Sequence, residues 1–404
     1  MTERLTRGGT SGLRTNRLAV CVVFATSGAA FATWAGRIPA VQDRLGLPPG
    51  GLGVALLGLT TGAVVALPLS GALIARFGSR RTTRTAAAAL CLVLLLLPYA
   101  GSLPLLVAVL ALFGGSNSVL DTAMNAQAVE VETGYGRPIL SSFHGWWSVG
   151  GLAGSGVAAL VARDVPVRTH FTVVACLLLL AAVVASRGLP GSVRHVQRTP
   201  SFARPTKALA ALGAIAFCGL LAEGAAYDWS AVYLRDSAGA SPSLAATGFA
   251  ACSLAMAACR FGADRVVARL GAVRFVQLAG LVSTAGIVLA VGVPRPAVVI
   301  VGFGLLGGGL AGIVPVVFSG AGRVAPDRPG PALAAVATLG YLGLLAGPAA
   351  IGGIGEVFDV RAGLTFVVLL TALMTLLGAR VPAGSVAGAG EAMRVEKAAE
   401  LGGS

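Results

Sequence analysis

Twelve apolar blocks of roughly 20 residues alternate with short polar segments along the chain. Each block is long enough to cross the roughly 30 Å hydrocarbon core of a bilayer as an α-helix. The pattern therefore predicts an all-α polytopic membrane protein with twelve transmembrane helices and no separate soluble domain. The predicted spans are residues 17–36, 51–75, 84–100, 104–127, 141–162, 168–186, 209–234, 243–262, 273–293, 296–320, 331–355 and 361–379.

Sequence similarities at a constant offset indicate that the second half of the chain repeats the first. We expect two six-helix bundles with the same topology, residues 1–187 and 209–380, as in a parallel repeat. A basic linker (188–208) joins them, and a disordered tail (381–404) follows. Segments that match at an offset of 193 are LIARFG (73–78) with VVARLG (266–271), LFGG (112–115) with LLGG (305–308), and Gly150 and Gly154 with Gly343 and Gly347, while Trp34 and Trp229 match at 195.

Basic residues gather on one side of the predicted membrane. Of 30 Lys and Arg residues, 23 fall on the side of the N-terminus and 7 on the other side. This positive-inside bias predicts that both termini are cytoplasmic. It also accounts for the net charge of +14, so no nucleic-acid partner is expected. The excess of Arg over Lys suggests a bacterial genome. We therefore expect a multi-pass protein of the inner membrane, whose partner is the lipid bilayer.

The chain lacks the motifs of enzymes and metal proteins. Its six cysteines show no paired metal-ligand spacing, its three histidines are dispersed, and neither Gly-x-Ser-x-Gly nor His-Glu-x-x-His occurs. We therefore expect no catalytic residue, no metal and no cofactor. A sensor built on a transporter fold is a further alternative, which the absence of a signalling domain disfavours.

A polar face interrupts the fourth predicted span. Asn117, Asp121 and Asn125 are four residues apart, and each step drifts only about 40° around a helix, so they share one face. Polar side chains in lipid can simply hold helices together. A carboxylate is costly there, however, and is more typical of a solute or proton pathway. We predict that Asp121 couples protons and that the two asparagines bind substrate.

The seventh span carries a second acid. Glu223 lies beyond the midplane, and Tyr227 follows one turn later on the same face. A structural Glu–Tyr hydrogen bond is one interpretation. A role in proton coupling for Glu223 and in substrate binding for Tyr227 is the other, because alternating access would expose acids in the two halves in turn.

His144 and Trp147 occur in the segment FHGWWS near the start of the fifth span. The histidine is interpreted as an interfacial hydrogen-bonding residue or as a proton relay with Asp121, Glu130 or Glu132, because imidazole titrates near neutral pH. Trp147 is either a membrane-interface residue or a substrate-stacking residue.

Aromatic and charged residues end the first and seventh spans at similar depth. Trp34 and Arg37 end the first span, and Asp228 and Trp229 end the seventh. The tryptophan can belong to the interfacial belt while the arginine extends to water. The alternative hypothesis is an outer gate, in which Arg37 pairs with Asp228 and the two indole rings form a plug.

The segment GALIARFGSRR (71–81) resembles the signature G-x-L-A-D-R-x-G-R-K of the major facilitator superfamily. Gly71, Leu73, Arg76, Gly78 and Arg80 match, whereas Ala75 replaces the usual Asp. The resemblance implies a cytoplasmic gate built from Arg76, Arg80 and the repeated turn, where Asp264 and Arg269 lie.

A narrower resemblance is to the fucose permease-like branch, on the segments TWAGRIP (33–39), DTAMNAQAVEVE (121–132), SSFHGWWSVGG (141–151) and EGAAYDWSAVYL (223–234). In that branch an acid on the fourth helix takes part in proton coupling, and Asp121 matches it at the level of the helix. The resemblance implies a monomeric, proton-coupled secondary transporter of a small polar solute, sugar-like or a metabolite, working by alternating access. A drug or metabolite efflux proton antiporter is the alternative.

Overall fold

The computed structural model describes residues 3–135, 139–191, 206–325 and 329–382. These residues form α-helices joined by short turns, with no β-strand among them. The all-α prediction is thereby confirmed. Most of the predicted linker (192–205 of 188–208) and most of the predicted tail (383–404 of 381–404) lie outside the described residues.

Helices α1 to α7 make up the N-terminal half. Their bounds are α1 Glu3–Ala35, α2 Ile38–Leu45, α3 Pro49–Phe77, α4 Ser79–Leu96, α5 Leu103–Tyr135, α6 Leu140–Val161 and α7 Val167–Arg187, with a 3-10 turn at Leu97–Tyr99.

Helices α8 to α14 make up the C-terminal half. Their bounds are α8 Lys207–Asp236, α9 Pro242–Ala245, α10 Thr247–Gly292, α11 Pro296–Leu310, α12 Ile313–Val324, α13 Pro329–Val357 and α14 Val360–Leu377, with a 3-10 turn at Gly378–Arg380.

The repeat predicted from the sequence has the same backbone geometry in both halves. Gly78, between α3 and α4, has φ 81° and ψ 153°, and its repeat mate Gly271, inside α10, has φ 77° and ψ 160°. An L-residue with a side chain rarely adopts this conformation. Gly271 therefore divides α10 into two transmembrane segments, as Gly78 separates α3 from α4.

Glycine contacts inside the halves repeat as well. A Cβ atom on Gly114 would lie 1.9 Å from the carbonyl oxygen of Leu59, and one on Gly307 would lie 2.3 Å from that of Cys252. Leu59 and Cys252 are themselves 193 residues apart. The helix pairs α3–α5 and α10–α11 thus pack backbone to backbone in the same way.

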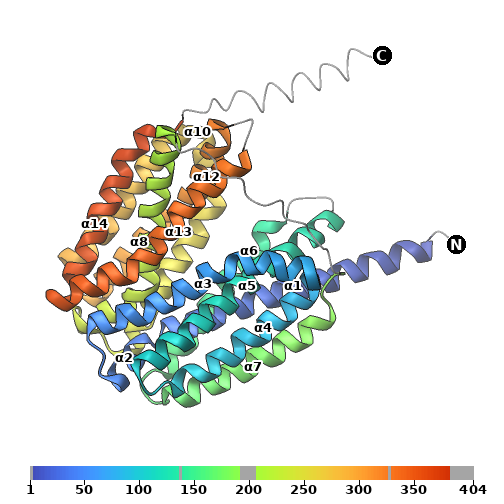
Figure 1. Cartoon of the computed structure of the whole chain (residues 1–404), viewed down its shortest axis with the longest axis horizontal. Helices are drawn as coiled ribbons and strands as arrows, with labels where there is room; N and C mark the ends of the chain where they lie inside the picture. Colours follow the sequence, from blue (N-terminus) through green and yellow to red (C-terminus); the bar gives the residue numbers. More distant parts are fainter. Residues whose placement is uncertain (1–2, 136–138, 192–205, 326–328, 383–404) are drawn as a thin grey trace, which may run out of the picture.

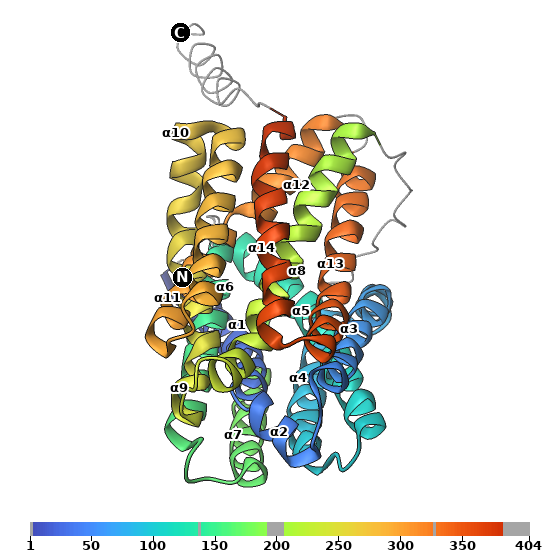
Figure 2. The same ribbon diagram turned by 90° about the vertical axis from the view of Figure 1, so that its left-hand side faces the viewer.

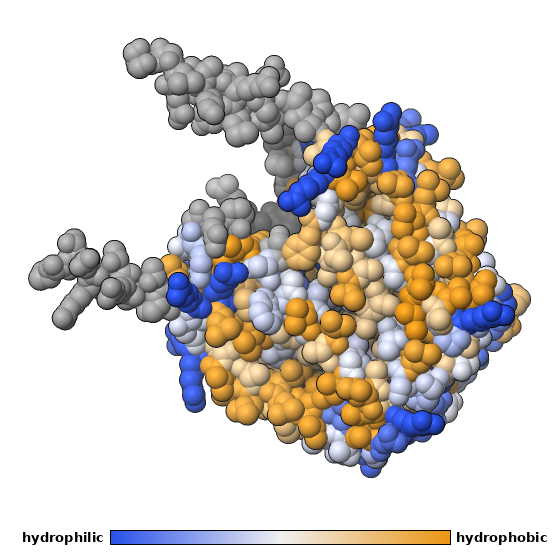
Figure 3. Space-filling model, turned by 180° about the vertical axis from the view of Figure 1, so that it is seen from behind, coloured by the Kyte–Doolittle hydropathy of each residue, from blue (hydrophilic) through white to orange (hydrophobic). Residues whose placement is uncertain are grey.

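Eleven helical segments of the described residues are long and apolar enough to cross a membrane. The twelfth predicted span corresponds to α6, whose first half contains Ser, His, Gly and Trp and is therefore less apolar. Apolar residues cover most of the face seen in Figure 3, and hydrophilic residues gather at its ends. This distribution is that of a protein with a lipid-facing belt.

The two halves converge at the side where α2 lies, and they diverge toward the side that carries both termini (Figures 1 and 2). We call these the α2 side and the termini side. On the α2 side, a Cβ atom on Gly53 of α3 would lie 2.6 Å from the carbonyl oxygen of Pro348 on α13. The backbone N–H of Gly50 donates to Oε2 of Glu356 at 2.9 Å. The halves are therefore closed against each other on the α2 side.

The predicted span 296–320 lies within one apolar segment long enough to cross a membrane, Pro296–Val324. Its helix is interrupted at Ala311–Gly312, between α11 and α12. Pro315 stands in the first turn of α12, where its missing N–H leaves no intrahelical bond unmade.

Candidate solute and proton site

Asn117, Asp121 and Asn125 lie on one face of α5, as their spacing of four residues predicts. Asn117 accepts a hydrogen bond from Oγ of Ser27 on α1 at 3.0 Å. Asn125 donates to the backbone oxygen of Asp121 at 2.8 Å and to its Oδ1 at 3.2 Å. Asp121 is exposed although it lies inside the membrane-spanning segment Leu103–Tyr135, and it has no ion pair with any described residue. The described residues therefore leave this carboxylate uncovered and without a cationic partner.

On α8, Glu223 and Tyr227 are joined by a hydrogen bond. The Tyr227 hydroxyl donates to Oε1 of Glu223 at 3.0 Å and also lies 3.6 Å from Sδ of Met256 on α10. The two residues are four apart in one helix, so their side chains lie on one face. Both the structural and the functional interpretation of Glu223 are compatible with this bond, because its second carboxylate oxygen stays free of hydrogen bonds within the described chain.

An aromatic cluster links the two halves next to this pair. The ring of Tyr227 lies 5.0 Å from that of Phe249 on α10 and 6.0 Å from that of Phe31 on α1, measured between centroids. Phe249 is completely buried, and Trp147 of α6 packs against the same cluster. Trp147 reaches this position because α1 and α6 touch at Gly28, where a Cβ atom would lie 2.0 Å from the Trp147 carbonyl oxygen. The cluster separates Glu223 from the α2 side.

His144 of α6 is exposed, and its ring packs edge-on against Phe24 of α1, with centroids 5.3 Å apart. It makes no side-chain hydrogen bond with Asp121, Glu130 or Glu132 in the described part of the chain. Glu132 instead accepts the backbone N–H groups of Ile139 and Leu140, both at 2.6 Å. Its carboxylate thereby caps the start of α6.

The sequence analysis missed Arg260, the cation that shares this region. Arg260 is exposed on α10, and its Nε donates to the carbonyl oxygen of Ala311 at 3.3 Å. It lies one turn after Met256, which contacts the Tyr227 hydroxyl. Arg260 falls within the predicted span 243–262 but was not predicted as a site residue. The signal that could have found it is its spacing of 11 residues from Phe249, which places both on one helix face.

The predicted outer-gate pair does not form, although the α2 side is closed. Arg37 is 3% exposed and donates to the carbonyl oxygens of Val161 at 3.2 Å and Val165 at 2.8 Å, at the end of α6. Burial lowers the pKa of its guanidinium. Asp228 is 4% exposed and makes no ion pair with a described residue. The two terminal nitrogens of Arg37 thus bond to backbone oxygens within its own half, whereas its buried Nε has no hydrogen-bond partner in the described chain.

The two tryptophans of the predicted plug are fully buried. The indole N–H groups of Trp34 and Trp229 find no hydrogen-bond partner in the part of the chain that the structure describes. The ion pair that was predicted beside them is absent from the described residues, and their role as a plug stays a prediction.

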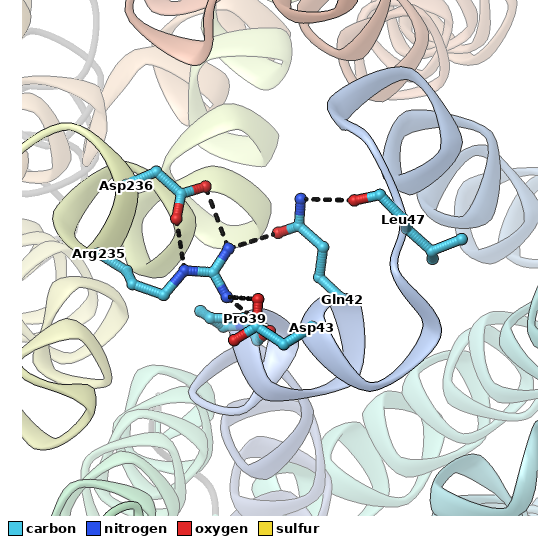
Figure 4. Close-up of polar contacts among 6 residues, drawn as sticks. All are labelled: Pro39, Gln42, Asp43, Leu47, Arg235 and Asp236. Atoms are coloured by element: carbon cyan, nitrogen blue, oxygen red, sulfur yellow. Dashed lines mark hydrogen bonds and ion pairs between the residues drawn. The ribbon is translucent and has the colours of Figure 1, made fainter.

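A different arginine bridges the halves at this place (Figure 4). Arg235 at the end of α8 pairs with Oδ1 of Asp43 on α2 at 2.8 Å and donates to Oε1 of Gln42 at 2.9 Å and to the carbonyl oxygen of Pro39 at 2.6 Å. Asp236 holds the other edge of the guanidinium. Arg235 thereby joins α8 to α2 across the interface between the halves.

With this geometry established, comparisons with known proteins identify the family. The sequence profile of the Major Facilitator Superfamily matches residues 19–348. The chain belongs to the Major Facilitator Superfamily. An uncharacterised transporter of this superfamily from Yersinia pestis is 36% identical over 350 residues, which is 86% of this chain and 91% of that protein. An uncharacterised transporter from Sinorhizobium fredii is 36% identical over 362 residues, 89% of this chain and 96% of that protein.

The fold of the superfamily is also evident in solved structures. A point mutant of the nucleoside transporter NupG superposes with a TM-score of 0.77 at 12% identity, covering 89% of this chain and 98% of that one. At this identity the likeness concerns the fold alone. The chain is a transporter of the superfamily and not an enzyme.

The signature turn of the superfamily lies on the termini side. Arg76 is exposed and lies over the ring of Phe77 at 5.2 Å, and Arg80 donates to the carbonyl oxygen of Arg187 at 3.1 Å. Arg269 is exposed. The side chain of Asp264 lies outside the described residues. Because Asp264 is the only acid of the predicted cytoplasmic gate, the ion pair of this gate stays a prediction.

Proposed function

We propose that this superfamily member is a proton-coupled secondary active transporter of a small polar solute, either sugar-like or a metabolite. It works as a monomer in the inner membrane by alternating access, with both termini cytoplasmic. Under this orientation the structure corresponds to an inward-open state, closed at the α2 side. The observation that carries the proposal is Asp121, an exposed carboxylate within a transmembrane helix that has no cation bound to it in the described chain. Such a group is expensive in lipid and supports a water-accessible pathway.

The roles of the neighbouring residues follow from their positions. Asp121 and Glu223 belong to opposite halves and are the proposed coupling acids, with His144 as a relay. Asn117, Asn125, Tyr227 and Trp147 are the proposed solute contacts, because amide, hydroxyl and indole groups suit a polar solute. Arg76, Arg80, Asp264 and Arg269 are proposed to close the termini side in the opposite state.

The fucose permease-like branch remains a hypothesis within this proposal. It is supported by the acid on the fourth transmembrane helix. NupG is described as a nucleoside transporter, and nucleosides belong to the class of polar solutes proposed here. The alternative is a drug or metabolite efflux proton antiporter, which the partly exposed rings of Phe31 and Tyr227 favour because they offer apolar surface next to the site.

Transport in proteoliposomes tests this proposal. The purified protein is reconstituted with a pH-sensitive dye in the lumen, and a panel of sugars, nucleosides and organic acids is added under an imposed pH gradient. We expect a solute whose accumulation follows the gradient and whose uptake acidifies the lumen. Asp121→Asn and Glu223→Gln should abolish the acidification. Asp164→Asn removes an exposed carboxylate in the turn between α6 and α7; it is the matched control and should keep the acidification.

A transported solute whose movement ignores the pH gradient in the wild type and in both variants would refute proton coupling. Lumenal alkalinisation during uptake would identify antiport and favour the alternative.

A further inference from the structure

Arg260 lies on the face of α10 that looks toward the other site helices. Phe249, Met256 and Arg260 fall within about 40° of one another around the helix. Phe249 contacts the rings of Phe31 and Tyr227, and Met256 contacts the Tyr227 hydroxyl. Arg260 is one turn closer to the termini side than Met256. It therefore continues the face of α10 that lines the proposed solute site.

The guanidinium reaches toward the middle of the membrane. Ala311, whose carbonyl oxygen accepts from Nε, lies at the break between α11 and α12, near the centre of the span Pro296–Val324. On the other side, α6 approaches α10 where a Cβ atom on Gly145 would lie 3.8 Å from Phe261, and His144 precedes that glycine. Arg260 thus bonds within its own half and lies next to a residue, Phe261, that approaches the other half.

No carboxylate neutralises Arg260 in the described part of the chain. Its hydrogen bond is to a neutral carbonyl, and no carboxylate oxygen of the described residues lies within 4.0 Å of its nitrogens. The side chain is exposed, and its terminal N–H groups make no hydrogen bond with the described residues, so they are free to bind a ligand. A guanidinium presents a planar fork that matches a carboxylate or phosphate with two parallel hydrogen bonds.

We propose that Arg260 binds an oxyanion group of the solute, so that the transported molecule is a polar metabolite carrying a carboxylate or phosphate. The inference rests on the proposed function and narrows its substrate class. Asn117 and Asn125 on α5, in the other half, then contact the uncharged polar part of the same solute. Arg260 thus selects solutes that carry a negative charge, and the side-chain amides of Asn117 and Asn125 bind the uncharged part of the solute.

Chemical modification of Arg260 tests the inference without transport. The wild-type protein in lipid nanodiscs is treated with phenylglyoxal, which reacts with guanidinium groups, and each labelled peptide is quantified by mass spectrometry. The probes are sulfate against chloride at equal ionic strength and glucuronate against glucose. Arg295, an exposed arginine on the α2 side, is the internal control.

We expect sulfate and glucuronate to slow labelling of Arg260 by about tenfold at ten times their dissociation constants, as occupancy requires. Chloride, glucose and the control residue should show no such effect. Equal labelling of Arg260 with and without either oxyanion, up to the solubility limit, overturns the inference, and so does equal protection by glucose.

The transport assay separates this result from the proposed function. For a solute transported in that assay, Arg260→Gln should abolish uptake, and Arg260→Lys should restore part of it. If Arg260→Gln leaves proton-coupled uptake unchanged, the anion inference fails while the coupling proposal stands. If uptake needs Arg260 but ignores the pH gradient, the coupling proposal fails and the anion inference stands.

Discussion

The two halves share their backbone packing but differ in their polar side chains. Gly78 and Gly271 adopt the same conformation, and Gly114 and Gly307 make the same backbone contact. At the same offset of 193, however, Asp121 corresponds to Val314 and Asn125 to Phe318. The repeat therefore determines how the helices pack in both halves, whereas polar residues such as Asp121 and Asn125 have no polar counterpart in the other half. The predictions below test first the shared packing and then polar groups present in one half.

The largest effect is expected for the shared glycine contacts. Gly114→Ala and Gly307→Ala place a Cβ atom 1.9 Å and 2.3 Å from a backbone oxygen, so both should destabilise the protein by about 2 kcal/mol or more through overpacking. Thermal unfolding of the purified protein measures this. Gly156→Ala is the control, because a Cβ atom there meets nothing within 4 Å. If only one of the two substitutions destabilises the protein, the two equivalent contacts do not contribute equally to stability.

Arg37 is expected to contribute stability but not gating. Arg37→Ala removes the two hydrogen bonds to the end of α6 and should cost about 2 kcal/mol, because the donor is charged and buried. Thermal unfolding again gives the measurement. Spin labels at the exposed residues Pro48 and Leu244 report the distance between the halves. An unchanged distance is expected, and a population of longer distances would restore the gate hypothesis for Arg37.

Arg235 is expected to contribute gating and little stability. Arg235→Ala removes one ion pair and two hydrogen bonds between α8 and α2, and it should increase the population open at the α2 side by about tenfold, equivalent to about 1.4 kcal/mol. The same pair of spin labels measures this. Arg295→Ala removes another arginine of the α2 side as a control. Identical distance distributions in both variants would exclude Arg235 as a latch.

The smallest effect is expected at the start of α6. Glu132→Gln weakens the two bonds to the N–H groups of Ile139 and Leu140 and should cost about 1 kcal/mol, as for other helix caps. Hydrogen exchange of these two amides should become faster. Glu130→Gln is the control on the same helix. If Glu132→Gln leaves exchange unchanged but stops proton coupling, the relay hypothesis for Glu132 applies instead of the capping role.

The features of the fold that depend on the periodicity of the sequence could be predicted. Apolar length predicted the spans, and a constant offset predicted the equivalent glycines, because backbone contacts between helices tolerate few residue types. The face of Asn117, Asp121 and Asn125 and the Glu223–Tyr227 bond also followed from helical geometry, since each set lies within one helix.

Interactions between helices were not predictable in the same way. Arg37 was assigned to Asp228 because opposite charges stood at similar depth, but carbonyl oxygens at the end of α6 were nearer. Arg235 was not predicted as a contact, because it falls between two predicted spans and its partner helix α2 was not expected as a separate helix. Arg260 was taken for a topology signal, since its position near the end of a span is where positive residues accumulate.

The contact between α3 and α13 has a mechanical consequence. At Gly53 and Gly352 the two backbones touch without side chains between them, so separating them uncovers little apolar area. Surfaces without interlocking side chains can also roll over one another without rotamer changes. The glycine pair thus gives the two halves a pivot with a low barrier, and Arg235, which reaches across the same interface, determines how long the closed position lasts.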